Sequence, residues 1–336
     1  MSLPLSNHST IEFGLSHGCT STEADVWLYN DTLYVGHDQS ALSTSRTLES
    51  LYINPILDVL ERQNPESPFV SKPTKNGVWD TDTEQTLYFF IDVKTSGPET
   101  FKAVIAALEP FRKKGYLTTV KDGKIITNGP VTVIGTGETP LDLVTPVKDR
   151  DYFFDAPLAN LTDPAYADIT RTVSPVASTD FQKTVGKITR DTDPILTDAQ
   201  LQALRDQIST ANERGIGARY WNTPYFPIRA RNLVWRTLLR EGVILLNADD
   251  LDAVTSLFWG VTAFVGRNPA IDVSDALAGA PFIFRSQVLR TFDEFTAAGV
   301  AAEVPDLHLS AEFQGAGVRH CGGLVNDIFM QAQSHR

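Results

Sequence analysis

The sequence predicts an α/β fold whose parallel strands and crossover helices form a TIM (β/α)8-type barrel that lacks its first strand. Apolar runs of strand length alternate with helical patterns along most of the chain, which favours parallel pairing. This alternation spans residues 9–258, close to the roughly 250 residues of such a barrel. A doubly wound open sheet is the rival architecture, but it usually has a glycine-rich phosphate turn after its first strand, and none follows here.

Seven candidate strands are expected, one fewer than a closed barrel requires, and the chain opens on a helix. The first strand follows Gly18, and the others occupy residues 87–95, 131–134, 152–155, 173–177, 218–221 and 243–247. Helical patterns cover residues 9–17, 44–62, 98–114, 197–215, 228–240 and 286–298, and a loop rich in Pro and Lys covers residues 63–84. The clearest helix begins with a capping box from Thr197 to Gln200.

Charge and composition exclude several classes of protein. The 336 residues include 29 Lys and Arg against 41 Asp and Glu, a net charge of -12, so we expect no nucleic-acid partner and no standing attraction to anionic membranes. No run of about 18 apolar residues predicts a membrane span, and the first ten residues do not resemble a secretory signal. Cys19 and Cys321 define no disulfide framework. Compartment and oligomeric state stay open.

Two carboxylates stand side by side in the first predicted strand. Glu23 and Asp25 are two residues apart, so an extended chain presents both on one face as a candidate cation site. An Asn30-Asp31 turn then reverses the chain, and Gly36 allows a bend that can bring His37 back toward the pair. A solvated strand face is the alternative interpretation of the same pattern.

The second predicted strand, LYFFIDVKT, is strongly apolar yet ends in Asp92 and Lys94. Charged residues at the end of a buried strand need partners. In a parallel barrel the carboxyl ends of the strands form the active face, so these residues could join the first two carboxylates there. A Schiff-base role for Lys94 is an alternative, but it would require a lysine away from carboxylates, and Asp92 lies two residues away.

Several segments together resemble a known superfamily: STEADVWLYNDTLYVGHD, SLYINPILDVLERQNP, FFIDVKTSG, RYWNTP and LLNADD. The chain resembles the PLC-like phosphodiesterases, in particular the glycerophosphodiester phosphodiesterase and sphingomyelinase D branch. Within this superfamily it is most similar to the fungal family named for altered inheritance of mitochondria. The resemblance covers residues 9–258 and implies a (β/α)8 barrel domain, followed by a C-terminal extension of unknown role at residues 259–336.

The resemblance also implies roles for individual residues. Glu23, Asp25 and Asp92 match the family's metal ligands, and three carboxylates suit Mg²⁺ or Ca²⁺. His37 matches the second of two catalytic histidines, and Lys94 could stabilise phosphate charge or orient the carboxylates. Trp221 matches an aromatic residue at the barrel mouth that binds substrate. The implied substrate is a glycerophosphodiester or a lysophospholipid-like diester, cleaved by water or by a neighbouring substrate hydroxyl.

One part of the family pattern is absent from this sequence. The first catalytic histidine should precede the Glu23 strand by a whole helix, and His8 and His17 lie too close to it. A truncated or rebuilt N-terminus is expected. Loss of one general acid or base lowers rates by about 10²- to 10⁴-fold, so activity is left open. The alternative function is a catalytically impaired barrel that binds metal and phosphate without turnover.

Overall fold

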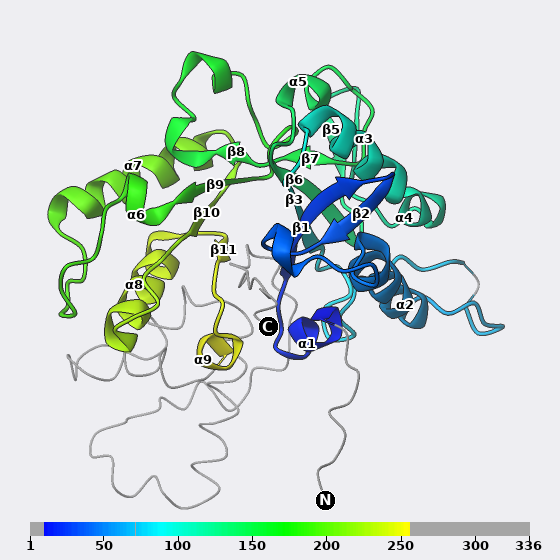
Figure 1. Ribbon diagram of the computed structural model, residues 1–336, viewed down its shortest axis with the longest axis horizontal. Coiled ribbons are helices and arrows are strands. Elements are labelled where there is room, and N and C mark those ends of the chain that lie inside the picture. The colour runs from blue at the N-terminus through cyan, green and yellow to red at the C-terminus, as the bar shows by residue number, and fades with distance from the viewer. Residues whose placement is uncertain (1–9, 71, 256–336) are drawn as a thin grey trace, which may run out of the picture. The chain divides into compact units, whose positions relative to one another are not determined.

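Two sheets with helices along them make up the structure, a computed structural model that describes residues 10–70 and 72–255 (Figure 1). The first sheet has the strand order β2-β1-β3-β6-β7, and the second has the order β11-β10-β9-β8. A separate hairpin pairs β4 with β5. The α/β class predicted from the sequence is confirmed.

The strands of the first sheet are β1 (Ser21–Tyr29), β2 (Thr32–Val35), β3 (Leu87–Val93), β6 (Val131–Gly137) and β7 (Phe153–Phe154). Those of the second are β8 (Ala156–Pro157), β9 (Val176–Asp180), β10 (Gly217–Trp221) and β11 (Leu245–Leu246). All neighbours within the two sheets are parallel except β1 and β2, which form an antiparallel hairpin. Positive φ angles at Asn30 and Asp31 form the tight turn between them, as the sequence predicted.

One predicted strand is divided between the two sheets. Phe153 and Phe154 pair with β6, whereas Ala156 and Pro157 pair with β9. Asp155 lies between the two halves, and its backbone N–H donates to the carbonyl of Gly135. The seven predicted strands therefore exist in the predicted order, with the fourth interrupted at Asp155.

The described residues do not form a closed barrel, so the predicted barrel architecture is not confirmed. Within residues 10–70 and 72–255, no strand pairing joins β11 to β1 or β2, so the result is two mixed or parallel sheets. The outer edge of β1 is covered by its own hairpin partner β2. The predicted segments beyond residue 255, including a helix at 286–298 and the extension at 259–336, lie outside the described residues.

The α-helices connect these strands. They are α1 (Thr10–Ser16), α2 (Asn54–Gln63), α3 (Gly97–Ala107), α4 (Glu109–Lys114), α5 (Leu141–Val144), α6 (Phe181–Thr184), α7 (Asp198–Glu213), α8 (Ile228–Glu241) and α9 (Leu251–Thr255). The Thr197–Gln200 capping box is present with both of its hydrogen bonds. None of the helices in the described part of the chain has the length and apolarity needed to cross a membrane.

Three local predictions need correction. The helix expected at 44–62 begins later, with a π-helical turn at Glu49–Ile53 before α2. The helix expected at 98–114 is two helices meeting at Leu108, because Pro110 has no N–H to continue the hydrogen-bond ladder. The β4–β5 hairpin (Thr119–Lys121 and Ile125–Thr127) was missed, although its Asp122-Gly123 turn is a strong hairpin signal.

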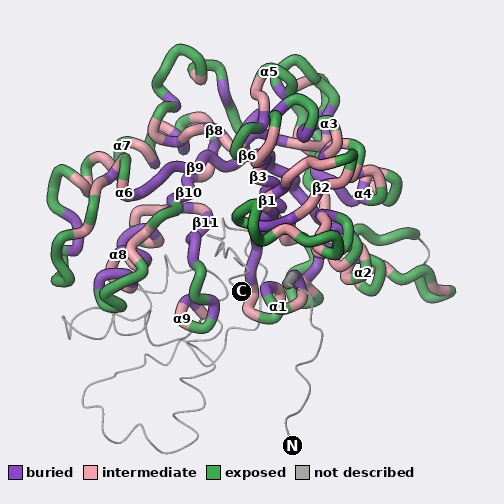
Figure 2. The backbone as a smooth tube through the Cα atoms, viewed as in Figure 1, coloured by how far each residue is buried: buried purple, intermediate pink, exposed green. Residues whose placement is uncertain are grey.

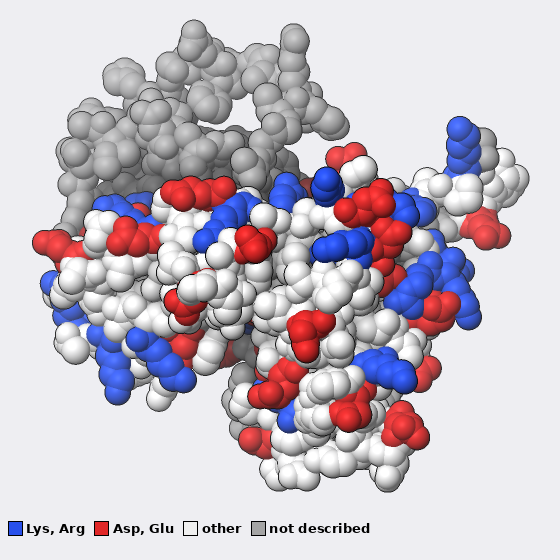
Figure 3. Space-filling view, turned by 90° about the horizontal axis from the view of Figure 1, so that it is seen from above, with Lys and Arg blue, Asp and Glu red and all other residues white. Residues whose placement is uncertain are grey.

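Two groups of buried apolar residues form the core. The strands of both sheets are largely buried along their length (Figure 2). The larger group packs α2, α3 and α4 against β1, β3 and β6. The smaller group brings together Phe90, Ile134, Phe153, Val176 and Leu245, which come from strands of both sheets. An apolar layer therefore lies between the two sheets. On the face shown in Figure 3, acidic and basic side chains are interspersed.

Candidate active site

Three carboxylates meet beside the first sheet. Glu23 and Asp25 lie on the same side of β1 because side chains alternate along a strand. The parallel pairing of β1 with β3 places Asp25 opposite Asp92. One oxygen atom from each carboxylate lies within 4.8 Å of the other two. The structure thus brings together the three residues that the sequence grouped.

Gly137 of β6 leaves the room that Asp92 occupies. It pairs with Val93, directly after Asp92, and has a φ of +64°. A Cβ atom at this position would collide with Oδ1 of Asp92 and with the backbone of Val93. Glycine is needed here both for backbone conformation and for space. The sequence analysis missed it, although the strand's Gly-Thr-Gly ending was a usable signal.

Lys94 is the cation closest to two of the carboxylates. Its Nζ lies 2.6 Å from Oδ2 of Asp92 and 3.1 Å from Oδ1 of Asp25. Burial alone would lower the pKa of Lys94, but the two carboxylates outweigh burial and its pKa lies above the ordinary value. The charged form is therefore favoured. This environment is the opposite of what a Schiff-base lysine requires.

His37 returns to the carboxylates as predicted. The Gly36 N–H donates to the carbonyl of Asp25 at 3.2 Å, and the Trp27 indole N–H donates to the Gly36 carbonyl at 2.7 Å. These bonds hold the bend that follows β2. Nδ1 of His37 lies 3.4 Å from Oδ2 of Asp25, and about half of the side chain (48%) is exposed to solvent. An imidazole thus lies beside the carboxylates while remaining accessible.

Arg219 of β10 is a site residue that the sequence analysis did not single out. Its Nη2 donates to Oε2 of Glu23 at 2.5 Å and to Oδ1 of Asn247 at 2.7 Å. The guanidinium also lies over the ring of Phe90, 4.6 Å from its centroid. Both side chains of the ion pair are buried, with 3% of Arg219 and 7% of Glu23 exposed. An Arg within the otherwise apolar run of β10 was the available signal, since a buried charge needs a partner.

Asp155 faces the same arginine from the break between β7 and β8. Its Oδ2 lies 3.9 Å from Nη1 of Arg219, and its side chain is only 3% exposed. Burial raises the pKa of Asp155 to about 7, although Arg219 and hydrogen bonds from Ser178 and Thr136 oppose the rise. Near neutral pH this carboxyl group is therefore divided between its neutral and charged forms.

The described contacts set two permanent cations, Lys94 and Arg219, against four carboxylates. Burial raises the pKa of Asp92, and the neighbouring Asp25 carboxylate adds to this rise. The Lys94 ammonium opposes it, but the pKa of Asp92 still lies above its ordinary value. The negative charge at Asp92 is therefore only partly compensated by the protein. A further cation beside these oxygens would stabilise the ionised form.

Trp221 ends β10 two residues after Arg219, and therefore lies on the same side of the strand. It is 39% exposed. Asn222 follows at a φ of +56°, and its amide donates to both carboxylate oxygens of Asp180 at 3.0 Å, which ties the loop to the end of β9. Beyond it, Tyr225, Phe226 and Ile228 are 82%, 73% and 60% exposed. The loop between β10 and α8, together with the first residue of α8, thus exposes several large apolar side chains.

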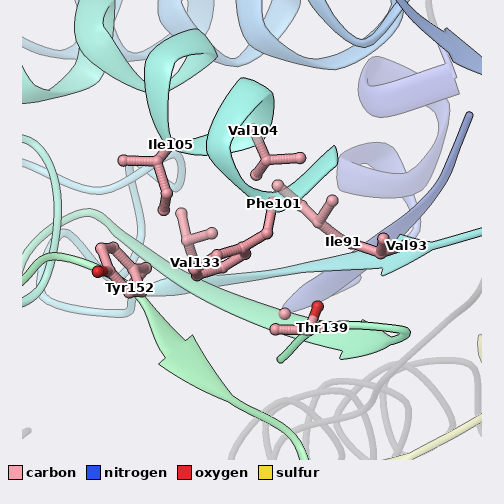
Figure 4. A pocket seen from close by; sticks show the side chains of 9 residues that line it. Ile91, Val93, Phe101, Val104, Ile105, Val133, Thr139 and Tyr152 are labelled. Atoms are coloured by element: carbon pink, nitrogen blue, oxygen red, sulfur yellow. The ribbon is translucent and has the colours of Figure 1, made fainter. Parts of the chain in front are cut away.

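A small apolar pocket lies elsewhere, between α3 and strands β3 and β6 (Figure 4). Val93, Phe101 and Val133 line it, and Thr139 and Tyr152 are its polar-tipped side chains. Its described lining includes no carboxylate, imidazole or ammonium group. We therefore regard it as a packing gap distinct from the carboxylate site.

Comparisons with known proteins identify the family of this chain. Residues 10–155 match the model of the AIM6-like phosphodiesterase domain, which places the chain among phosphodiesterase-domain proteins. The altered inheritance of mitochondria protein 6 homolog of Arthroderma benhamiae is 51% identical over 256 residues, covering 76% of this chain and 80% of the homolog. The chain therefore belongs to the altered inheritance of mitochondria protein 6 family.

More distant relatives match as well. Altered inheritance of mitochondria protein 6 of Eremothecium gossypii is 33% identical over 251 residues, covering 72% of this chain and 64% of that protein. The Saccharomyces cerevisiae protein of the same name is 31% identical over 266 residues, with coverage of 73% and 66%. The chain thus spans just under two thirds of these yeast relatives. No solved structure matches.

Proposed function

We propose that this protein is a metal-dependent phosphoric diester hydrolase that acts on a glycerophosphodiester or lysophospholipid-like substrate. The observation that carries the proposal is the meeting of three carboxylates with Lys94 and the accessible His37. Membership of a family with a phosphodiesterase domain supports the same reaction class. Each group has a role in cleaving a diester that follows from its chemistry and position.

Glu23, Asp25 and Asp92 are the proposed metal ligands. Carboxylate oxygens are the donors that Mg²⁺ and Ca²⁺ prefer, and the only partly compensated charge at Asp92 favours a cation. The bound ion would neutralise charge that develops on the non-bridging phosphate oxygens. Lys94 contacts two of these carboxylates, so it orients them and adds positive charge where the phosphate would bind.

His37 is the proposed general acid or base. Its ring is about half exposed and Nδ1 lies 3.4 Å from Oδ2 of Asp25, so the imidazole is accessible to a diester bound beside the carboxylates. It would donate a proton to the leaving oxygen as the ester bond breaks. The attacking oxygen comes from water or from a neighbouring substrate hydroxyl, giving hydrolysis or a cyclic phosphate.

A (β/α)8-type barrel is the proposed complete architecture. The apolar layer between the sheets supports it, because Phe90 lies in that layer and Asp92 lies two residues further along the same side of β3. Arg219 of β10 donates a hydrogen bond to Glu23 of β1, so strands of the two different sheets lie within side-chain reach of each other. Apolar residues below and charged residues toward the carboxyl ends are typical of barrel enzymes.

The apolar loop after β10 favours a substrate with an acyl chain. Trp221 begins this loop on the same side of β10 as Arg219, and we propose it as a substrate-binding residue. The exposed Tyr225 and Phe226 would contact the apolar part of a lipid or the surface that contains it. A water-soluble glycerophosphodiester would make less use of these side chains.

A barrel that binds metal and phosphate without turnover is the second candidate. The observation that favours it is that, within residues 10–70 and 72–255, the contacts between imidazoles and the three carboxylates involve His37 alone. The other described histidine, His17, contacts Asp252 instead. His37 would then act without a second general acid or base, and diester cleavage needs both a proton donor and a proton acceptor.

Cleavage assays with added Mg²⁺ separate the two candidates. Glycerophosphodiesters and choline lysophospholipids are the substrates, and His37→Ala is compared with His17→Ala as a matched control. Metal-dependent cleavage that falls about 10²-fold or more in His37→Ala alone would support the hydrolase. A folded, Mg²⁺-binding protein without turnover would favour the binding protein, and equal losses in both variants would exclude the role of His37.

A further inference from the structure

We infer that Arg219 is a positioning residue that biases the carboxylate site toward Mg²⁺ and against Ca²⁺. This inference rests on the proposed metal site and adds a determinant of ion choice to it. Arg219 would do so by keeping one oxygen of Glu23 bound to the protein. Glu23 would then offer a single oxygen to an ion rather than two.

The ion pair is held firmly enough for this role. Nη2 of Arg219 lies 2.5 Å from Oε2 of Glu23 and 2.7 Å from Oδ1 of Asn247, while Nη1 donates to the Ser178 hydroxyl at 3.3 Å. The ring of Phe90 lies against the guanidinium face. These contacts come from four different segments of the chain, so the guanidinium cannot turn away without losing several of them.

Burial strengthens the constraint. With 3% of Arg219 and 7% of Glu23 exposed, water has little access to replace the hydrogen bond between them. A buried carboxylate released from its guanidinium would lose a charged partner that water cannot readily replace. Oε2 of Glu23 is therefore expected to stay with Arg219 when an ion binds nearby.

The other two carboxylates are restricted in a similar way. Lys94 contacts Oδ2 of Asp92 and Oδ1 of Asp25. Nδ1 of His37 lies 3.4 Å from Oδ2 of Asp25, so neither carboxylate has both oxygens free of protein contacts. The site therefore favours one oxygen from each of three carboxylates, with water as the remaining ligands. Mg²⁺ suits this set because it binds six oxygens and keeps several waters, whereas Ca²⁺ takes six to eight and often binds a carboxylate through both oxygens.

Charge and coordination can be separated by comparing the two ions. Removing Arg219 removes one positive charge, and this strengthens the binding of any divalent cation. Freeing Oε2 of Glu23 helps the ion that can use a second oxygen. The ratio of the two dissociation constants therefore reports the second effect, because the charge term is common to both ions.

The test is isothermal titration calorimetry of the chelator-treated 336-residue chain with MgCl₂ and with CaCl₂. In Arg219→Met, the Ca²⁺ affinity should rise relative to the Mg²⁺ affinity by about tenfold, the scale typical of residues that orient metal ligands. Arg205→Met is the matched control, because Arg205 forms a similar two-point contact with Glu241 on the surface. Its ratio should equal that of the wild type.

If Arg219→Met does not fold, Arg219→Lys replaces it, and the ratio should move in the same direction, because an ammonium lacks the planar fork that bonds Glu23 and Asn247 together. An unchanged ratio in a folded variant that binds both ions would overturn the inference, as would a wild-type chain that binds neither. A shifted ratio in a chain that cleaves no diester would support the inference while excluding the hydrolase.

Discussion

Replacement of Asp155 by Asn tests the electrostatics of the buried site most directly. The pKa of Asp155 rises from 3.8 to about 7 on folding, because burial disfavours the charged carboxylate. Since the pKa is raised in the folded state, the stability linked to this group is present at acid pH and is lost as pH rises from about 4 toward 7. Asn cannot ionise, so Asp155→Asn should lack this loss.

The size of the effect follows from the shift. A difference of about three pKa units corresponds to about 4 kcal/mol in full, of which about 2–3 kcal/mol falls between pH 5 and pH 8. Relative to the wild type, Asp155→Asn should therefore gain about 2–3 kcal/mol of unfolding free energy between pH 5 and pH 8. Any stability change from the substitution that does not depend on pH would add equally at each pH.

Urea unfolding at pH 5, 6, 7 and 8 with a circular-dichroism readout measures this difference. Asp142→Asn, at an exposed position in α5, controls for the loss of one carboxylate and should follow the pH dependence of the wild type. A difference between Asp155→Asn and the wild type that stays constant from pH 5 to pH 8 would refute the reasoning, because the buried carboxyl would then not titrate in that range.

Three further predictions concern the site and its surroundings. Gly137→Ala should lower the free energy of unfolding, measured in urea, by about 1–2 kcal/mol for its positive φ alone. It should also weaken Mg²⁺ binding, measured by calorimetry, because the added Cβ atom displaces Asp92. Lys94→Met should destabilise the metal-free protein by about 1–3 kcal/mol, because two carboxylates lose their counter-charge. Adding Mg²⁺ should then raise the Tm of this variant more than that of the wild type, and an equal rise would contradict the role of Lys94 as counter-charge. The double variant Tyr225→Ser with Phe226→Ser should reduce sedimentation with phosphatidylcholine vesicles by about tenfold or more, while Mg²⁺ binding stays unchanged. Retained vesicle binding would exclude the lipid-contact role of this loop.

Local rules predicted the parts of the structure that depend on neighbouring residues. Strand alternation predicted that Glu23 and Asp25 share a face, and the Asn30-Asp31 turn with Gly36 predicted the return of His37. Such features are encoded within a few residues, so periodicity and turn chemistry suffice. The same reasoning failed at Leu108, where the apolar spacing continued through a break that Pro110 imposes on the backbone.

The sequence by itself determined the α/β alternation, the order of the strands along the chain and the shared face of Glu23 and Asp25, because each depends on local patterning. Only the tertiary structure decided that Arg219 binds Glu23, 196 residues away, and that Gly137 makes room for Asp92. It also decided that the strand at Asp155 divides between two sheets and buries that carboxyl group. These outcomes depend on how parallel strands align across the sheets, and no local period specifies which distant charges meet inside a core.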